Sequence, residues 1–166
     1  ASAVIAALSV SGLPTDKFRF IGFLPSKSSQ RRTAIEALKG VTETIVCYEA
    51  PHRIASTIED FSDIFGPQRL AFMAREITKT FETYLHGDLT DLLRQVTEDS
   101  NQQRGEIVLV VAGQEKTVET TPADSEKLLG LLMKELPLTK AASIAAKITG
   151  VDKKQLYQLA LSLQKK

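Results

Sequence analysis

The 166-residue sequence contains little cysteine and histidine and no tryptophan. Its only cysteine is Cys47, and its two histidines are His52 and His86. One cysteine excludes an intramolecular disulfide, and two separated histidines without cysteine partners do not make a zinc site. We therefore expect no metal centre. Because Cys47 stands in an apolar run, we expect it to be a buried structural thiol.

Long apolar runs and several well-known site motifs are also missing. No segment approaches the roughly 18 apolar residues of a membrane span, and the apolar residues 1–10 lack the basic region and cleavage site of a signal peptide. These absences favour a cytoplasmic protein that does not enter a membrane. There is also no P-loop, no G-x-G-x-x-G loop and no G-x-S-x-G nucleophile elbow. The net charge of +1 indicates no partner, and it weakens an interpretation as a DNA-binding regulator.

The pattern of apolar residues predicts an α/β domain in the first two thirds of the chain. Strands are expected at 18–24, 43–48, 69–75, 80–87 and 106–112. Helices are expected at 1–10, 30–38, 52–65 and 89–96. Strands that alternate with helices indicate a mixed or parallel sheet flanked by helices. The first helix is apolar on nearly all sides, so it needs packing partners over most of its surface.

A polar stretch at 114–124 separates this domain from an all-helical tail. Ala146 precedes Gly150 by four residues, a spacing typical of a helix-turn-helix, and Asp152 is placed to cap the next helix. The tail either contacts nucleic acid, with Lys153 and Lys154 on its exposed face, or serves as a structural or dimer-forming element. The expected divisions are 1–16, 17–113, 114–124 and 125–166.

Charged residues gather where two of the expected strands end. Glu49 follows Tyr48 at the end of one strand, and Arg75 and Glu76 end another. Ligands of α/β sheets bind beyond the carboxyl ends of strands, which favours a polar cleft here. A negatively charged helix start for Glu49 and a surface salt-bridge array are the alternatives. Tyr48 offers a flat face for a base.

Two further features point to ligand contact. Gly105 stands immediately before the most apolar strand, where it allows a close approach or simply makes a turn. Lys27, Arg31 and Arg32 form a basic, serine-rich loop that suits phosphate contact or is only a solvated surface.

Four segments in this order and spacing resemble the ribosomal RNA small subunit methyltransferase I family. They read SGLPTDKFRFIGFLPSKSSQRR, YEAPHRI, AREITKTFET and RGEIVLVVAG. The resemblance implies the second domain of a tetrapyrrole-methylase-like fold, S-adenosylmethionine as cofactor, and methylation of the ribose 2′-hydroxyl of a cytidine in 16S rRNA of the 30S subunit. It also implies a homodimer, and a further domain before residue 1 without which this chain is inactive.

The resemblance also assigns expected roles to individual residues. The cofactor would lie against Ser2, Ala3, Tyr48, Glu49, Gly105 and Glu106. The RNA would face Lys27, Arg31 and Arg32, and independently of the resemblance we expect it to contact Arg53, Lys153 and Lys154.

Methyl transfer to a ribose hydroxyl needs alignment of three atoms and removal of a proton. The hypothesis is that Glu49 or Glu76 accepts that proton and that Arg75 or Lys79 stabilises the developing negative charge. Two alternatives stay open: a methyltransferase for a tetrapyrrole-like small molecule, and a non-catalytic RNA-binding or dimerisation module.

Overall fold

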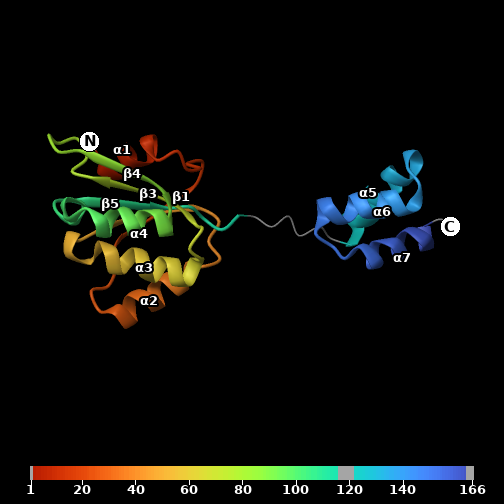
Figure 1. The fold of residues 1–166 in the computed structure, drawn as a ribbon, viewed down its shortest axis with the longest axis horizontal. Helices are drawn as coiled ribbons and strands as arrows, with labels where there is room; N and C mark the ends of the chain where they lie inside the picture. The colour runs from red at the N-terminus through yellow and green to blue at the C-terminus, as the bar shows by residue number, and fades with distance from the viewer. Residues whose placement is uncertain (1, 116–121, 164–166) are drawn as a thin grey trace. The chain divides into compact units, whose positions relative to one another are not determined.

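The computed structural model describes residues 2–115 and 122–163. The chain forms two compact units, Ala1–Glu115 and Lys116–Lys166 (Figure 1). The first unit is an α/β domain and the second is helical. The predicted fold class is therefore confirmed.

The first unit contains a five-stranded sheet in the order β1-β2-β5-β3-β4. The strands are β1 (Phe18–Phe23), β2 (Thr44–Glu49), β3 (Leu70–Arg75), β4 (Thr83–Asp88) and β5 (Ile107–Val111). Strands β1 and β2 are parallel, whereas every other neighbouring pair is antiparallel. The sheet is therefore mixed, and β5 lies between β2 and β3.

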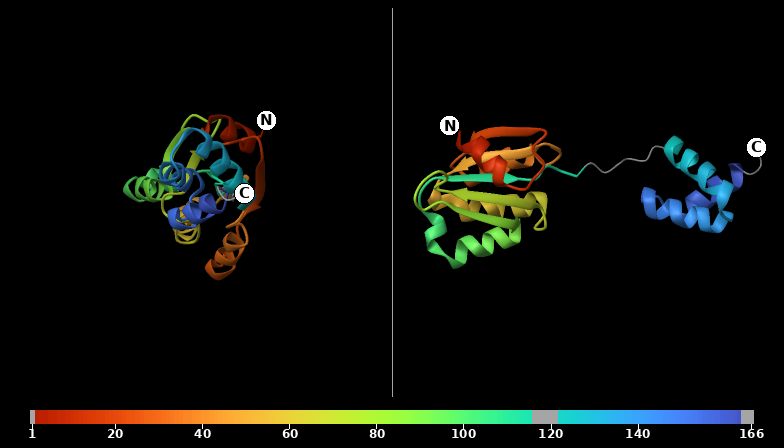
Figure 2. Two further views of the ribbon diagram at one scale, coloured as in Figure 1. Left: turned by 90° about the vertical axis from the view of Figure 1, so that its right-hand side faces the viewer. Right: turned by 90° about the horizontal axis from the view of Figure 1, so that it is seen from above.

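Helices cover both faces of the sheet, as the views in Figures 1 and 2 show. Helix α1 (Ala3–Val10) covers one face, α3 (Ile54–Phe65) and α4 (Leu89–Glu98) cover the other, and α2 (Ser28–Glu36) packs on α3. Strand β5 is buried along its whole length. Its residues alternate between the two cores because successive side chains of a strand point to opposite faces. Its continuous apolar sequence thus reflects cover on both sides.

The burial of Cys47 and of helix α1 can be compared with the expectations from the sequence. Cys47 is fully buried in the sheet, as predicted. Helix α1 buries Val4, Ala7 and Leu8, but Ile5 is 55% exposed and Val10 is 40% exposed. The described first unit therefore packs against only part of this helix.

Two predicted boundaries were wrong for identifiable reasons. Strand β4 begins at Thr83 and not at residue 80, because residues 76–82 form a tight loop with hydrogen bonds from Lys79 N to Glu76 O and from Glu82 N to Lys79 O. The predicted helix at 52–65 starts as a 3-10 turn, Pro51–Arg53, before α3 begins. Proline suits this position because its missing N–H would have no partner in a first turn.

The second unit consists of α5 (Pro122–Glu135), α6 (Leu138–Thr149) and α7 (Lys153–Leu163). A small apolar core joins them, and it includes Leu129, Ala145 and Leu156. The turn between α6 and α7 has the predicted form. Gly150 adopts φ 71° and donates its N–H to Ala146 O, and Asp152 caps α7 through its Oδ1.

Residues 2–115 and 122–163 lack two kinds of feature. In that part of the chain no helix has the length and apolar character of a membrane span. It also holds no cluster of three or more histidine, cysteine or carboxylate side chains that could bind a metal ion.

Candidate functional site

The two charged strand ends lie at one edge of the sheet. Strands β2 and β3 run in the same direction, and β5 runs antiparallel between them. Ile107 at the start of β5 pairs with Glu49 on one side and with Arg75 on the other. The topology thus brings together segments that are separated in the sequence.

A cavity with a volume of about 560 Å³ opens at this edge. It is bounded by the start of α1, the ends of β1 and β2, the loop after β3 and the start of β5. The lining includes five of the six predicted cofactor residues, namely Ala3, Tyr48, Glu49, Gly105 and Glu106. Ser2 is exposed and does not line it. Of the predicted catalytic residues, Glu49 and Lys79 line the cavity, and Glu76 contacts the lining.

A charged cluster forms one wall of this cavity. Glu76 Oε1 accepts the backbone N–H of Glu106 at 2.8 Å and the Lys79 ammonium at 3.0 Å. Lys79 Nζ also lies 2.9 Å from Glu106 Oε2. The hydrogen bond from the Glu106 backbone, followed by that from Lys79, lowers the pKa of Glu76. Hydrogen bonds to Glu106 and Glu76 raise the pKa of Lys79. The site therefore holds an ionised Glu76 and a protonated Lys79.

Gly105 has no side chain, and the charged cluster occupies the space that a side chain at this position would fill. It adopts φ 78°, and a Cβ atom there would lie 2.5 Å from Glu76 Oε1. Glu76 and Thr78 also have positive φ values, 52° and 66°. Left-handed residues other than glycine are uncommon and gather at functional loops. The wall is thus a strained loop held by specific hydrogen bonds.

Glu49 has a different environment from the one expected of a proton acceptor. Its side chain is fully buried. Its Oε1 accepts from Ala50 N at 2.6 Å and from Arg53 Nη2, and its Oε2 accepts from Thr57 Oγ1 at 2.7 Å. Both carboxylate oxygens are thus engaged in holding the turn after β2. In the structure Glu49 therefore positions the cavity wall, and its role as proton acceptor stays a prediction.

Several predicted RNA contacts are also occupied within the fold. Arg53 is bound to Glu49, and its side chain is only 16% exposed. Arg31 is buried, with its Nε 2.6 Å from Asp60 Oδ2. Both guanidinium groups are paired within the fold, so a structural role accounts for each of them, and their contact with RNA stays a prediction. The reason is the same in each case, because a buried charge requires a partner within the fold.

Other predicted contacts remain accessible. Lys27 is exposed, and the Arg32 side chain is 43% exposed although it pairs with Asp60 and Asp63. The hydrogen bonds that Arg32 donates to Asp63 and Asp60 raise the pKa of its guanidinium. In the second unit, Lys153 and Lys154 are exposed at the start of α7.

Arg75 holds the loop that carries Lys79 and does not line the cavity. Its Nε donates to Thr83 Oγ1 at 2.8 Å, and its Nη2 donates to Phe81 O at 3.0 Å. Arg75 therefore fixes both ends of the loop between β3 and β4. In the structure Arg75 has this positioning role, and its contact with the reacting oxygen stays a prediction.

Sequence reasoning missed Phe23 and Ile77, which also line the cavity. The signal for Phe23 was available, because Gly22 inside an apolar strand indicates a bulge that redirects the next side chain. No comparable signal marked Ile77, which follows a left-handed residue in an irregular loop.

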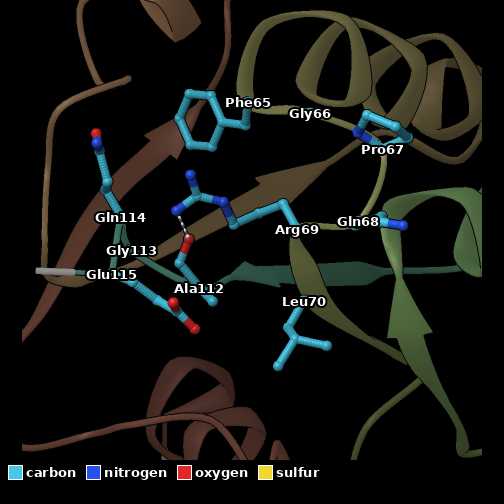
Figure 3. A pocket seen from close by; sticks show the side chains of 10 residues that line it. All are labelled: Phe65, Gly66, Pro67, Gln68, Arg69, Leu70, Ala112, Gly113, Gln114 and Glu115. Atoms are coloured by element: carbon cyan, nitrogen blue, oxygen red, sulfur yellow. Dashed lines mark hydrogen bonds between the residues drawn. The ribbon is translucent and has the colours of Figure 1, made fainter. Parts of the chain in front are cut away.

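A second cavity, with a volume of about 550 Å³, opens between the α3–β3 turn and the end of β5 (Figure 3). In it, Arg69 donates to Ala112 O at 3.4 Å and lies over the Phe65 ring at 5.4 Å from its centroid. None of the predicted site residues lines this cavity. The cavity at the ends of β2 and β3 is therefore the candidate site.

Two family models match separate parts of the chain. The family model described as tetrapyrrole (corrin/porphyrin) methylases matches residues 1–93. The chain belongs to the tetrapyrrole (corrin/porphyrin) methylase family. A second model, described as the RsmI C-terminal HTH domain, matches residues 119–164.

Curated relatives of this methylase family member confirm the resemblance carried by the four sequence segments. The chain is 49% identical over 166 residues to the ribosomal RNA small subunit methyltransferase I of Pseudomonas aeruginosa, covering 99% of this chain and 59% of that protein. It is 46% identical over 162 residues to the protein of the same name from Escherichia coli O157:H7, covering 98% of this chain and 57% of that protein. The chain thus spans less than two thirds of the length of these relatives.

A solved structure supports the methylase fold independently. The crystal structure of the methyltransferase CobJ superimposes with a TM-score of 0.51 at 17% identity, covering 68% of this chain and 48% of that one. At this identity the likeness concerns the fold alone.

Proposed function

We propose that this chain forms part of an S-adenosylmethionine-dependent methyltransferase that modifies small-subunit ribosomal RNA, and that the cavity at the ends of β2 and β3 receives the cofactor. The observation that carries the proposal is the cavity itself: five of six residues expected to contact the cofactor line it. The relatives named ribosomal RNA small subunit methyltransferase I supply the substrate class. The finer assignment is methylation of a cytidine 2′-hydroxyl in 16S rRNA.

The residues that line the cavity fit a ligand of this kind. Its volume of about 560 Å³ lies within the range of about 300 to 1,000 Å³ that is typical of small-molecule sites. Tyr48, Ile77 and Val108 offer apolar surface for an adenosine, while Glu106 offers a negative charge for an amine. These residues would hold the cofactor.

When bound, S-adenosylmethionine would supply the methyl group on its sulfonium for transfer to the ribose oxygen, leaving the sulfur as a neutral thioether while the hydroxyl proton passes to water. Lys79 stabilises the negative charge that develops on the ribose oxygen. Glu76 and Glu106 keep Lys79 protonated and in place. Because its pKa is lowered, Glu76 is a weak base, and we assign it this positioning role.

The same proposal includes the surfaces that meet the ribosome. Lys27 and Arg32 contact rRNA phosphates from the first domain, 17–113, and Lys153 and Lys154 do so from the tail, 125–166. The protein acts in the cytoplasm on 30S subunits as a homodimer, without a membrane or DNA partner. The exposed apolar residues of α1 support a further interface.

The test uses a chimaera in which this chain replaces the segment that it matches in the Pseudomonas aeruginosa relative. Labelled S-adenosylmethionine and 30S subunits from a strain without the modification are the substrates. We expect label in 16S rRNA at one cytidine ribose. Lys79→Met should lower kcat by about 100-fold, a typical cost of losing one electrostatic stabiliser.

Lys39→Met is the matched control, because Lys39 is an exposed lysine in the turn after α2 that pairs with Glu36 and does not line the cavity. Cofactor affinity is measured separately by calorimetry. A chimaera that binds S-adenosylmethionine but leaves 30S subunits unlabelled would refute the rRNA assignment and favour a small-molecule acceptor. A chimaera that neither binds S-adenosylmethionine nor labels 30S subunits would refute the cofactor site.

A further inference from the structure

Three aromatic rings form a continuous exposed surface beside the cavity. Phe20 is 45% exposed and Phe23 is 63% exposed. Their ring centroids lie 5.0 and 5.6 Å from that of the half-buried Tyr48. We call Phe20, Phe23 and Tyr48 the aromatic platform. Large exposed rings on neighbouring strands gain little for folding, so this arrangement calls for a ligand.

A β-bulge creates the platform. Phe20 pairs with Val46 and Phe23 pairs with Tyr48, so β1 advances by three residues over a stretch in which β2 advances by two. Gly22, with φ 66°, accommodates the extra residue. In a regular strand Phe23 would lie on the same face as Ile21, which packs into the core under α3. The bulge instead places Phe23 on the Tyr48 side, and bulges commonly redirect side chains next to binding sites.

The platform adjoins both the cavity and a basic segment. Phe23 and Tyr48 line the cavity, so whatever covers the platform lies next to the ligand inside. Residues 15–32 contain five basic residues and one acidic residue, but Arg31 is buried against Asp60, and Arg19 and Arg32 pair with carboxylates outside the segment. Lys17, Arg19 and Lys27 in this segment are exposed. The occupant must therefore have flat apolar groups and negative charge.

We propose that the aromatic platform stacks an unpaired base of the RNA substrate and thereby sets the target nucleotide at the mouth of the cavity. This inference rests on the proposed function in taking RNA as the substrate. Aromatic side chains flanked by lysine and arginine bind single-stranded nucleic acid through stacking and phosphate contacts. A second copy of this chain fits less well, because two such basic segments would repel each other across an isologous interface.

The first experiment measures binding of the chain to a short cytidine-rich RNA by fluorescence anisotropy. We expect Phe23→Ala to raise the Kd about tenfold, in keeping with the usual loss on truncating a stacking ring. Phe23→Trp should retain most of the affinity. Phe18→Ala is the matched control, because Phe18 lies in the same strand and is 42% exposed, but it pairs with Thr44 away from the cavity. Urea unfolding of each variant confirms that it folds.

An RNA with an abasic central nucleotide separates stacking from phosphate contact. The wild-type chain should lose about tenfold in affinity for the abasic RNA, whereas Phe23→Ala should lose much less, since ring and base act as a pair. Equal losses for both proteins would overturn the proposal. So would equal effects of Phe18→Ala and Phe23→Ala, or no measurable binding of the unmodified RNA. A Phe23→Ala change that abolishes self-association without changing RNA affinity would identify the platform as a protein interface instead.

The methyl-transfer assay with the chimaera distinguishes a failure of this inference from a failure of the proposed function. A raised KM for 30S subunits with an unchanged KM for S-adenosylmethionine in Phe23→Ala supports the platform. An active chimaera whose KM for 30S subunits is unchanged by this substitution overturns the platform and leaves the proposed function intact. If the wild-type chimaera is inactive but Phe23→Ala and the abasic RNA still show non-additive effects on binding, the proposed function is refuted and the role of the platform is supported.

Discussion

Replacing Glu49 is expected to destabilise the first unit, because this carboxylate is fully buried and fully engaged. It accepts hydrogen bonds from a backbone N–H, from the Arg53 guanidinium and from the Thr57 hydroxyl. Glu49→Ala leaves these three donors without their acceptor. It also leaves the mostly buried Arg53 without its counter-charge, and Arg53 Nε already has no hydrogen-bond partner among residues 2–115 and 122–163.

The expected loss can be estimated from this geometry. Removing one partner of a buried ion pair costs about 3 to 5 kcal/mol. A unit of this size has a free energy of unfolding of about 6 to 17 kcal/mol, from about 0.05 to 0.15 kcal/mol per residue. The Glu49→Ala variant should therefore fold but unfold at a lower urea concentration than the wild type. With a urea m-value of about 2 kcal/mol/M, the midpoint falls by about 1.5 to 2.5 M.

Tyrosine fluorescence can report this transition, since the chain has three tyrosines and no tryptophan. Tyr48 and Tyr84 lie in the first unit, and a Tyr157→Phe background removes the signal of the second. The double variant Glu49→Leu/Arg53→Met removes both charges, so it should be markedly more stable than Glu49→Leu alone.

A midpoint within about 0.3 M of wild type for Glu49→Ala would refute the structural role, because it corresponds to well under 1 kcal/mol. Activity of the chimaera provides the second readout. If Glu49→Gln abolishes methyl transfer while stability and cofactor affinity stay unchanged, Glu49 acts on the substrate and its role is not only structural.

Three further predictions concern other buried or charged groups. Asp60→Ala leaves the buried Arg31 unpaired and should cost about 3 to 5 kcal/mol in urea unfolding; a loss below about 1 kcal/mol would contradict it. Because the pKa of Glu76 is lowered in the folded chain, its contribution to stability is present above the ordinary glutamate range and is lost as the pH falls through the folded pKa. The difference in urea midpoint between wild type and Glu76→Gln should shrink on acidification, and a constant difference would count against the hydrogen bonds that Glu76 accepts from Lys79 and from the Glu106 backbone N–H. Burial raises the pKa of the Cys47 thiol, so Ellman's reagent should react at pH 8 only in urea; rapid reaction of the native chain would refute its burial.

The sequence alone predicted most of the elements and their order. Periodicity and β-branched runs located the strands, and the glycine at residue 150 and the aspartate at residue 152 located the turn of the helical tail. These features depend on interactions between near neighbours in the chain, so they can be read locally. The segments quoted for the family resemblance likewise predicted which strand ends would form the site.

Tertiary structure decided which of the charged residues face the site. Glu49, Arg31 and Arg53 look like ligand contacts in the sequence, but partners four and twenty-nine residues away pair with them inside the fold. The bulge at Gly22 and the left-handed loop at Glu76 likewise set the directions of Phe23 and Lys79. Pairing of buried charges and local backbone twist depend on contacts that exist only after the chain has folded. For this reason the sequence determined where the cavity lies, and the fold determined which side chains are available in it.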